Sequence, residues 1–430
     1  MSTLEAGREM HAWARDLFPI CRSLTGDGVR RTLRYLGALL PELVEYEVPS
    51  GTECFGWTVP DEWNIRDAYL LDEAGRRVID FQAHNLHVMG YSEPVDVFLS
   101  LEELQARLYS LPDQPDAIPY VTSYYKRNWG FCLTHAQRMT LTEQRYRAVI
   151  DSTLQPGHMS YGEVFLPGES DRTILLSTYV CHPSMGNNEL SGPVLAAALG
   201  RWLRRERRRC SYLILFLPET IGAIYYLHKH LPELKKKLLA GYVLSCAGDE
   251  RGYSYLPSRY GDTLADRALL HVLTSRHPGF TRYSYLDRAS DERQYNAPGA
   301  DLPVIPFARS LYRRFPEYHT SLDDLSLITP RGLQDSFDTL RSCLNVLEYN
   351  DRYRGAYPCE PRLDKHGLYP TTSIKGDYGR QVTTMIDFLA HCDGRLDLIE
   401  IAERIGVPAE ECHQAAETLL GAGVIERVQA

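Results

Sequence analysis

The spacing of hydrophobic and polar positions changes several times along the chain, and each change marks a different expected element. From residue 8 to 45, apolar residues recur at helical spacing in "REMHAWARDLF" and "VRRTLRYLGALLPEL", which predicts two helices joined by a turn. From about 46 to 152, short β-branched and aromatic runs alternate with Pro, Gly and Asp residues. This alternation of strand-forming runs and turn residues predicts an inserted β-rich domain over residues 46–152.

A repeated strand–loop–helix pattern begins near residue 153. The buried-strand runs "RTILLSTYV", "SYLILFLPE" and "AGYVLSCAG" alternate with the helical segments "GPVLAAALGRWLRRE" and "AIYYLHKHLPELKKKL". This alternation predicts an α/β fold with a mixed or mostly parallel sheet flanked by helices. We expect residues 1–45 and 153–355 to form this core, with a ligand site at the C-terminal ends of its strands.

Three short helical periods occupy residues 376–430, after a connector rich in Pro and Tyr, and they predict a winged-helix domain. Its four Arg, absent Lys and ten acidic residues give a net charge of 4 − 10 = −6. Because phosphate contacts dominate DNA affinity, we expect this domain to bind no nucleic acid. It, or the inserted domain, could instead mediate a homo-oligomer.

The amino-acid composition excludes several functional classes. The 430-residue chain has a formal net charge of −9, which argues against a general nucleic-acid or anionic-membrane binder. No apolar run approaches the roughly 20 residues of a membrane span, and the N-terminus lacks a signal-peptide pattern. Ten Cys without a CxxC pair indicate reduced thiols rather than a zinc ribbon. We therefore expect a cytoplasmic protein without a membrane partner.

The expectation that ligands bind at the C-terminal ends of the strands selects candidate catalytic and metal-binding residues. His182 follows the first strand run, Glu219 the second, and Cys246 or Asp249 the third, while His319 comes later in "FPEYHTSLDDL". Imidazoles and carboxylates from several strand ends can hold a zinc ion that keeps one position for water, and a nearby Glu can accept a proton from that water. Each residue also has a structural alternative: a hydrogen-bonded His, or a Glu that caps the next helix.

The order and spacing of these residues resemble a known family. The runs "LLSTYVCHPSMGNNELSGP", "FLPETIGAIYYL", "SDERQYNAPGADLPVIPF" and "YHTSLDDL" are similar to the zinc aminopeptidases that include leucyl aminopeptidase and glutaminyl cyclase. The whole chain resembles a bacterial subfamily with an aminopeptidase-like core, an inserted β domain and a C-terminal winged helix. "CRSLTGDG" and "IPYVTSYYKRNWGFC" are similar to its signature stretches.

The resemblance implies roles for individual residues. His182 and His319 match the first and last metal-ligand histidines, and Glu219 matches the general base. Asn188 falls where dinuclear relatives have an Asp that bridges two zinc ions, and Thr220 falls where they have a second metal-binding Glu. Because Thr cannot replace a carboxylate as a strong zinc ligand, the resemblance implies one zinc ion rather than two, and the neutral amide of Asn188 would bind that ion more weakly than a carboxylate.

Other matches leave choices open. Either Cys246 or Asp249 corresponds to a ligand Asp after the third strand; we place Asp249 with His182, Asn188 and His319 as the expected metal ligands. Near these residues, four charged side chains are candidates for substrate binding: Asp291, Glu292, Arg293 and Arg259. The two arginines could fork onto a substrate carboxylate or phosphate, or form ordinary salt bridges.

Together these features predict a zinc-dependent hydrolase that cleaves an amide bond of a small peptide or of an N-acyl or aminoacyl substrate. Acyl transfer or cyclisation on the same scaffold is the alternative within enzymes. Because of Asn188, a metal-free binding or assembly protein is the alternative outside them, and one sequence does not show whether Asn188 is native or an engineered substitution.

Overall fold

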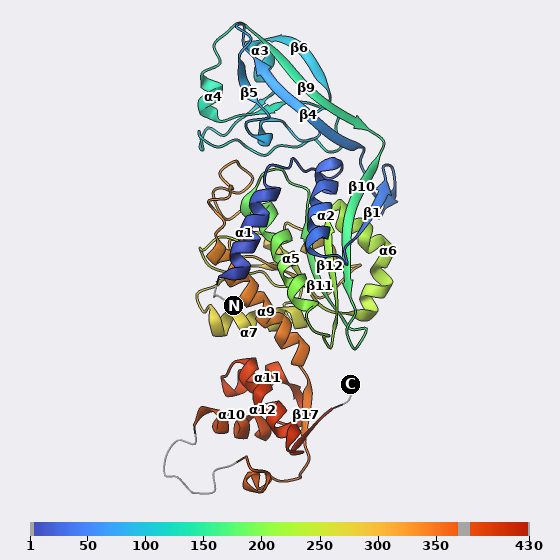
Figure 1. The fold of residues 1–430 in the computed structure, drawn as a ribbon, viewed down its shortest axis with the longest axis vertical. Helices are drawn as coiled ribbons and strands as arrows, with labels where there is room; N and C mark the ends of the chain where they lie inside the picture. The colour runs from blue at the N-terminus through green and yellow to red at the C-terminus, as the bar shows by residue number, and fades with distance from the viewer. Residues whose placement is uncertain (1–3, 369–378, 429–430) are drawn as a thin grey trace. The chain divides into compact units, whose positions relative to one another are not determined.

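The computed structural model describes residues 4–368 and 379–428 (Figure 1). The chain divides into two compact units, which we describe separately. The first consists of Met1–Gly261 with Thr281–Phe337, and the second of Asp262–Phe280 with Asp338–Ala430. Within the described ranges, no helix is long and apolar enough to cross a membrane.

A six-stranded mixed sheet forms the centre of the first unit. Four neighbouring strands are parallel, and the other two are antiparallel to their neighbours. Every residue of β11 and β12 is buried, which explains why both read as continuous apolar runs in the sequence. The expected mixed sheet flanked by helices is confirmed. In sheet order the strands are β1 (Val44–Pro49), β10 (His158–Leu166), β12 (Ser211–Leu217), β11 (Thr173–Tyr179), β13 (Leu238–Leu244) and β16 (Val304–Phe307).

Helix α5 (Ser191–Leu203) lies directly on this sheet, in contact with β11, β12 and β13 (Figure 1). Helices α1 (Glu5–Leu17) and α2 (Asp27–Leu39) pack against α5. A glycine permits the close approach at the start of α5: a Cβ atom on Gly192 would lie 2.3 Å from the carbonyl oxygen of Leu244. The contact brings the start of α5 against the end of β13, where the expected ligand site lies.

The remaining elements of this core are short apart from two helices. They are the π-helical turn η2 (Gly186–Leu190), α6 (Ile221–Lys237), β14 (Ser254–Tyr255), β15 (Thr281–Arg282), the 3-10 turn η3 (Tyr285–Asp287), α8 (Glu292–Tyr295) and α9 (Pro330–Tyr349), whose residues belong partly to each unit.

Residues 50–155 are β-rich, as predicted from their alternating β-branched and aromatic runs and turn residues. They contain an antiparallel sheet in the order β5 (Arg77–Asp80), β4 (Glu62–Leu71), β9 (Arg145–Gln155) and β6 (Val95–Ser100). Shorter elements surround it: β2 (Glu53–Cys54), β3 (Trp57–Thr58), η1 (Asn85–His87), α3 (Leu101–Gln105), β7 (Leu108–Tyr109), β8 (Phe131–Cys132) and α4 (His135–Met139). Since β1 and β10 belong to the central sheet, the chain leaves and re-enters the core through adjacent strands.

The second unit contains the three helices expected near the C-terminus, together with parts of the chain that the sequence did not assign to it. The elements are α7 (Leu264–Arg276), η4 (Leu363–His366), α10 (Arg380–Ala390), α11 (Leu398–Ile405) and α12 (Ala409–Gly421), with a sheet in the order β18 (Asp393–Asp397), β17 (Arg352–Gly355), β19 (Ile425–Arg427). The middle strand β17 comes from the segment read as a connector. Residues 369–378, within or beside that connector, lie outside the described residues.

Candidate active site

Two candidate residues meet at the C-terminal edge of the central sheet. His182 lies three residues beyond β11 and Glu219 two residues beyond β12, and these strands are parallel neighbours. The Nε2 atom of His182 is 3.5 Å from an oxygen of Glu219. Their side chains differ in exposure, 4% for His182 and 24% for Glu219, so the carboxylate is the one that solvent reaches.

The orientation of His182 is fixed by a buried carboxylate. Glu189 Oε2 lies 2.9 Å from His182 Nδ1, and Glu189 Oε1 accepts a hydrogen bond of 3.2 Å from Arg22 Nε. Both Arg22 and Glu189 side chains are fully buried. Burial alone would lower the pKa of His182, but the hydrogen bond and charge of Glu189 raise it above its usual value. With Nδ1 held by Glu189, Nε2 is the nitrogen that faces the candidate site.

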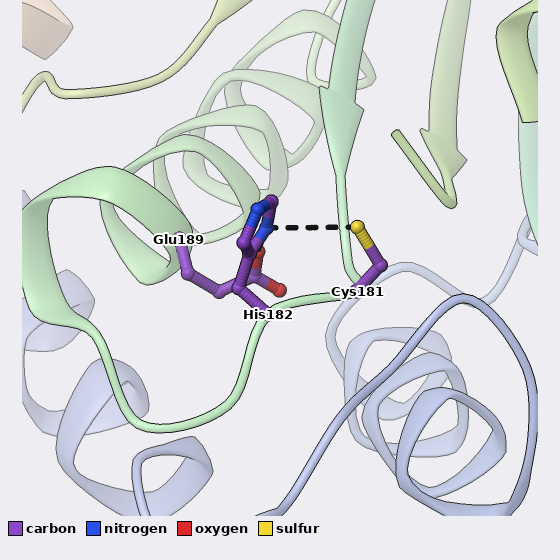
Figure 2. Close-up of side chains that lie close together, drawn as sticks. All are labelled: Cys181, His182 and Glu189. Atoms are coloured by element: carbon purple, nitrogen blue, oxygen red, sulfur yellow. Dashed lines mark hydrogen bonds and ion pairs between the residues drawn. The ribbon is translucent and has the colours of Figure 1, made fainter. Parts of the chain in front are cut away.

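Cys181, His182 and Glu189 bring their ligand-type atoms within 4.8 Å of one another (Figure 2). Cys181 Sγ accepts a hydrogen bond of 3.1 Å from the backbone N–H of Glu219. Burial raises the pKa of the Cys181 thiol far above its usual range, whereas metal binding requires the thiolate. Since Glu189 is already paired with Arg22, this cluster is a hydrogen-bonded support behind His182, and not the better of the possible metal sites.

Glu219 is held from the opposite side. Ser290 Oγ donates a hydrogen bond of 2.7 Å to Glu219 Oε1, and Asp291 Oδ1 accepts one of 2.7 Å from the backbone N–H of Thr220. Thr220 has a φ of 66°, an uncommon conformation for a β-branched residue that such a contact can stabilise. Burial, followed by the charge of Glu219, raises the pKa of Asp291 well above its usual range. Asp291 therefore supports the turn that presents Glu219.

His319 completes the group of residues that the structure brings together. Its ring centre is 5.5 Å from that of His182, and the Tyr318 ring stacks on it at 3.9 Å. Burial, with smaller effects of His182 and Arg313, lowers the pKa of His319 to about 3. Neither of its ring nitrogens has a hydrogen-bond partner among the described residues, so both are available to a ligand.

Asn188 lies on η2, close to the end of β13. Its Oδ1 accepts a hydrogen bond of 3.1 Å from the hydroxyl of Tyr179 and is 4.0 Å from Cys246 Sγ. Its Nδ2 is buried and has no partner in the described parts of the chain. The backbone N–H of Asn188 donates to Asp323, 2.8 Å away, and burial raises the pKa of Asp323 to about 7.

The carboxylate of Asp249 is directed toward Asn187 and Ser310, and not toward the two histidines. Its carboxylate accepts hydrogen bonds from the Asn187 side chain at 2.9 Å, the Arg251 backbone at 2.8 Å and the Ser310 hydroxyl at 3.0 Å. No recorded contact joins it to His182 or His319 within the described residues. Of the two candidates after the third strand, the structure thus places Cys246, and not Asp249, against Asn188.

The four expected substrate-binding residues do not form one exposed surface. Asp291 and Glu292 are almost completely buried, and Glu292 accepts a hydrogen bond of 2.6 Å from Tyr312. Arg259 forms an ion pair with Asp301 and lies over the ring of Tyr260. Arg293 alone is exposed next to the site: its Nη2 donates to Thr220 Oγ1 at 3.0 Å, and its charge acts on the buried carboxyl group of Asp291.

The donor set is compatible with one zinc ion. Two imidazoles bound to a tetrahedral zinc ion at ~2.0–2.1 Å would have ring centres about 5 Å apart, close to the 5.5 Å between His182 and His319. His182 Nε2 has Glu219 as its neighbour at 3.5 Å, and the ring nitrogens of His319 accept and donate no hydrogen bond among the described residues. A second ion has less support, because Thr220 supplies no carboxylate and its hydroxyl already bonds to Arg293.

Sequence reasoning did not identify Arg22, Glu189, Tyr120 or Asp323 as parts of the site. Glu189 stands inside the motif "NNELSG", so a buried acid beside a candidate ligand was a usable signal. Arg22 and Tyr120 lie far from that motif in the chain, and no local pattern marks them.

Comparison with known proteins places this arrangement in context. A family model described as a domain of unknown function, DUF4910, matches residues 11–350, and a winged helix-turn-helix model matches residues 338–427. The second match confirms the predicted winged helix.

A Clostridium acetobutylicum protein, provisionally named a polysaccharide biosynthesis protein with an aminopeptidase-like domain, is 42% identical over 418 residues, covering 96% of this chain and 95% of its own. A crystal structure from the same organism, provisionally named a peptidase, has a TM-score of 0.93 at 40% identity and covers 99% of this chain and 97% of that one.

The structure of a zinc aminopeptidase from Bacillus subtilis has a TM-score of 0.55 at 10% identity, covering 79% of this chain and 94% of that one. At this identity the likeness shows the fold alone, and it confirms the expected aminopeptidase-like core. Because the family model spans most of the chain and a relative is 42% identical along nearly all of it, this protein belongs to the DUF4910 family and has an aminopeptidase-like fold.

Proposed function

We propose that this protein is a hydrolase that uses one zinc ion to cleave an amide bond in a small peptide or in an N-acyl or aminoacyl compound. One observation carries the proposal: at the strand ends His182 Nε2 lies 3.5 Å from Glu219, and the ring of His319 lies 5.5 Å from that of His182. The fold shared with zinc aminopeptidases supports the choice of reaction and metal.

His182 and His319 would hold the ion. Asn188 is the proposed further ligand: its Oδ1 accepts a hydrogen bond from Tyr179, whose ring lies 5.1 Å from that of His182, and Cys246 Sγ is 4.0 Å from the same oxygen. When bound, zinc polarises a carbonyl group and makes a neighbouring water more acidic. Asp249 would act through Asn187, to which it is hydrogen bonded, and thereby position the neighbouring Asn188.

Glu219 is the proposed general base. It would accept a proton from the attacking water and return it to the amine nitrogen that leaves when the C–N bond breaks. Ser290 holds Oε1, which leaves Oε2 directed toward His182. Glu189 and Arg22 would keep His182 in the tautomer whose Nε2 carries the free lone pair.

Arg293 is the residue best placed to bind a polar group of the substrate. Its guanidinium uses one recorded hydrogen bond, to Thr220, directly after Glu219 in the chain. The remaining N–H groups would donate two parallel hydrogen bonds to a carboxylate next to the scissile amide. A relative provisionally named for polysaccharide biosynthesis supports adding N-acylated sugars to the compounds worth testing.

A metal-free binding or assembly protein is the second candidate, and Asn188 is the observation that favours it. Its buried Nδ2 has no partner in the described chain, and its neutral amide is a weaker ligand than a carboxylate. Thr220 removes a further carboxylate from the site. This candidate predicts a protein that holds no zinc whatever the medium supplies.

Elemental analysis of the purified full chain, with activity measured on aminoacyl, peptidyl and N-acyl amides, tests the proposal. We expect about one zinc per chain and release of free amine, and product analysis separates hydrolysis from cyclisation or acyl transfer. The Glu219→Gln variant should keep its zinc and lose turnover, whereas the His182→Ala variant should lose the zinc. A metal-free, inactive wild-type chain would refute the hydrolase and favour the binding protein.

We further propose that the protein works in the cytoplasm, because its ten cysteines are all unpaired and oxidising compartments favour disulfides. The winged-helix domain would contact a second copy of this chain, and not DNA. Its α12 carries three glutamates and no Lys or Arg.

A further inference from the structure

Residues 117–124, in the loop between β7 and β8 of the β-rich insertion, are bonded to the loop that carries His319. The backbone N–H of Tyr120 donates to the carbonyl oxygen of His319, and the N–H of Ser321 donates to the carbonyl oxygen of Ile118, each at 2.9 Å. Ile118 also donates its N–H to Ser321 Oγ at 2.9 Å. Three hydrogen bonds thus join the two segments, one at His319 and two at Ser321.

The backbone of His319 depends on such contacts. Its φ of 58° lies in the left-handed region, where a residue with a Cβ atom is strained unless its surroundings hold it there. The carbonyl of His319 itself is bonded to Tyr120 and, two residues on, the N–H of Ser321 is bonded to Ile118. The insertion therefore fixes the direction in which the His319 side chain leaves the backbone.

The side chain of Tyr120 adds a second restraint. Its ring centre is 5.1 Å from that of His319, in an edge-on arrangement of 88°, and 5.3 Å from that of His182. The ring of Tyr318 stacks on His319 at 3.9 Å. Tyr120 is itself anchored by a hydrogen bond of 2.6 Å between its hydroxyl and that of Tyr124. One ring from the insertion thus contacts both imidazoles.

We propose that the β-rich insertion is a working part of the candidate site, in which residues 117–124 hold the His319 loop in its left-handed conformation. Tyr120 is the positioning residue that fixes the two imidazoles relative to each other. The consequence for zinc and turnover rests on the proposed function, whereas the control of the His319 loop is a property of the fold alone.

Four full-length variants test this inference. Tyr120→Ala removes the ring, Tyr120→Phe keeps the ring and removes the hydroxyl, and Ser321→Ala removes the acceptor of the Ile118 N–H. Tyr125→Ala is the matched control: its side chain is 54% exposed and bonds to Thr58 within the insertion. Amide hydrogen exchange of the peptide covering residues 316–323 is followed by mass spectrometry, and zinc affinity is followed by competition with a chelator.

We expect Tyr120→Ala to speed exchange in residues 316–323 and to weaken zinc binding by about 10-fold or more, as removal of groups that orient metal ligands does. Exchange in β11 and β12 should stay at the wild-type rate. Tyr125→Ala should match the wild type in both measurements, whereas Tyr120→Phe, which keeps the ring but loses the bond to Tyr124, should weaken zinc binding less than Tyr120→Ala does. Ser321→Ala should raise exchange in the same peptide, and it decides the question if Tyr120→Ala does not fold.

Wild-type exchange in residues 316–323 of the folded Tyr120→Ala and Ser321→Ala variants would overturn the inference. Unchanged zinc affinity in a Tyr120→Ala variant with faster exchange would overturn the role of Tyr120 as a positioning residue. If the wild-type protein hydrolyses nothing or binds no zinc, the proposed function fails by itself, and the exchange measurement still decides whether the insertion holds the His319 loop.

Discussion

Replacement of Arg22 by methionine should destabilise the first unit strongly. Arg22 is fully buried, and its Nε donates to Glu189 Oε1 at 3.2 Å and to the carbonyl oxygen of His182 at 2.8 Å. Its Nη1 donates to the carbonyl oxygen of Leu17 at 2.8 Å. Methionine fills much of the same volume without any donor, so Glu189 would remain buried beside His182 without its cationic partner.

Breaking a buried ion pair by removing one partner costs about 3–5 kcal/mol. For a unit of about 320 residues the unfolding entropy is about 0.7 kcal/mol/K, so such a change corresponds to a fall in the unfolding midpoint of roughly 4–8 °C. Circular dichroism of the wild-type and Arg22→Met proteins during heating measures it. Arg147→Met is the matched control, because the pair of Arg147 with Asp96 has a contact of 2.8 Å but is 39% and 57% exposed. Exposed pairs contribute about 0–1 kcal/mol.

A second replacement separates charge from packing. In Arg22→Met/Glu189→Gln the remaining buried charge is removed as well, so part of the lost stability should return if the unpaired carboxylate is the cause. A midpoint for Arg22→Met within about 1 °C of the wild type, which is under roughly 1 kcal/mol, would refute the reasoning. A double variant less stable than Arg22→Met would show that lost packing, and not the charge, dominates.

Glu219→Gln should reduce turnover by about 10²–10⁴-fold while zinc content stays unchanged, since only the proton acceptor is lost; equal turnover in the two proteins would remove Glu219 from the reaction. Asn188→Asp should raise zinc affinity in chelator competition, because a carboxylate replaces a neutral amide, and an unchanged affinity would show that this side chain does not reach the ion. Arg293→Gln should lower kcat/KM for amides with a neighbouring carboxylate and leave neutral amides unaffected; an equal loss for both kinds would contradict substrate recognition by this residue. Burial would raise the pKa of Glu62, but hydrogen bonds, led by that from Arg30, lower it to about 2. Because this folded-state pKa lies below the unfolded value of ~4.3, the stabilisation is complete above that value and is lost as the pH falls through about 2. Glu62→Gln should flatten the dependence of unfolding free energy on pH in this window, and an unchanged slope measured by denaturant titration would contradict it.

The types of element could be predicted because they depend on neighbours a few residues away. The apolar runs of β11 and β12 and the helical spacing of α5 are visible in the sequence, and so is the β-rich texture of residues 50–155. The rule that ligands bind at the C-terminal ends of parallel strands led to His182 and Glu219, which the structure places 3.5 Å apart. Local pattern did not reveal that α7 and β17 belong to the second unit, since that depends on long-range packing.

The sequence by itself determined the α/β and winged-helix architecture and the residue types that meet at the strand ends. Only the tertiary structure decided which of them face one another. Asp249 is turned toward Asn187 while Cys246, with a φ of 51°, lies against Asn188, and the backbone turn after β13 sets that choice. Arg22 and Glu189 are 167 residues apart, and Tyr120 reaches His319 from the insertion. The hydrophobic periodicity of a sequence reflects interactions between residues close together in the chain. The ion pair of a buried charge and the packing around an imidazole join residues far apart in the chain, so they form only in the folded structure.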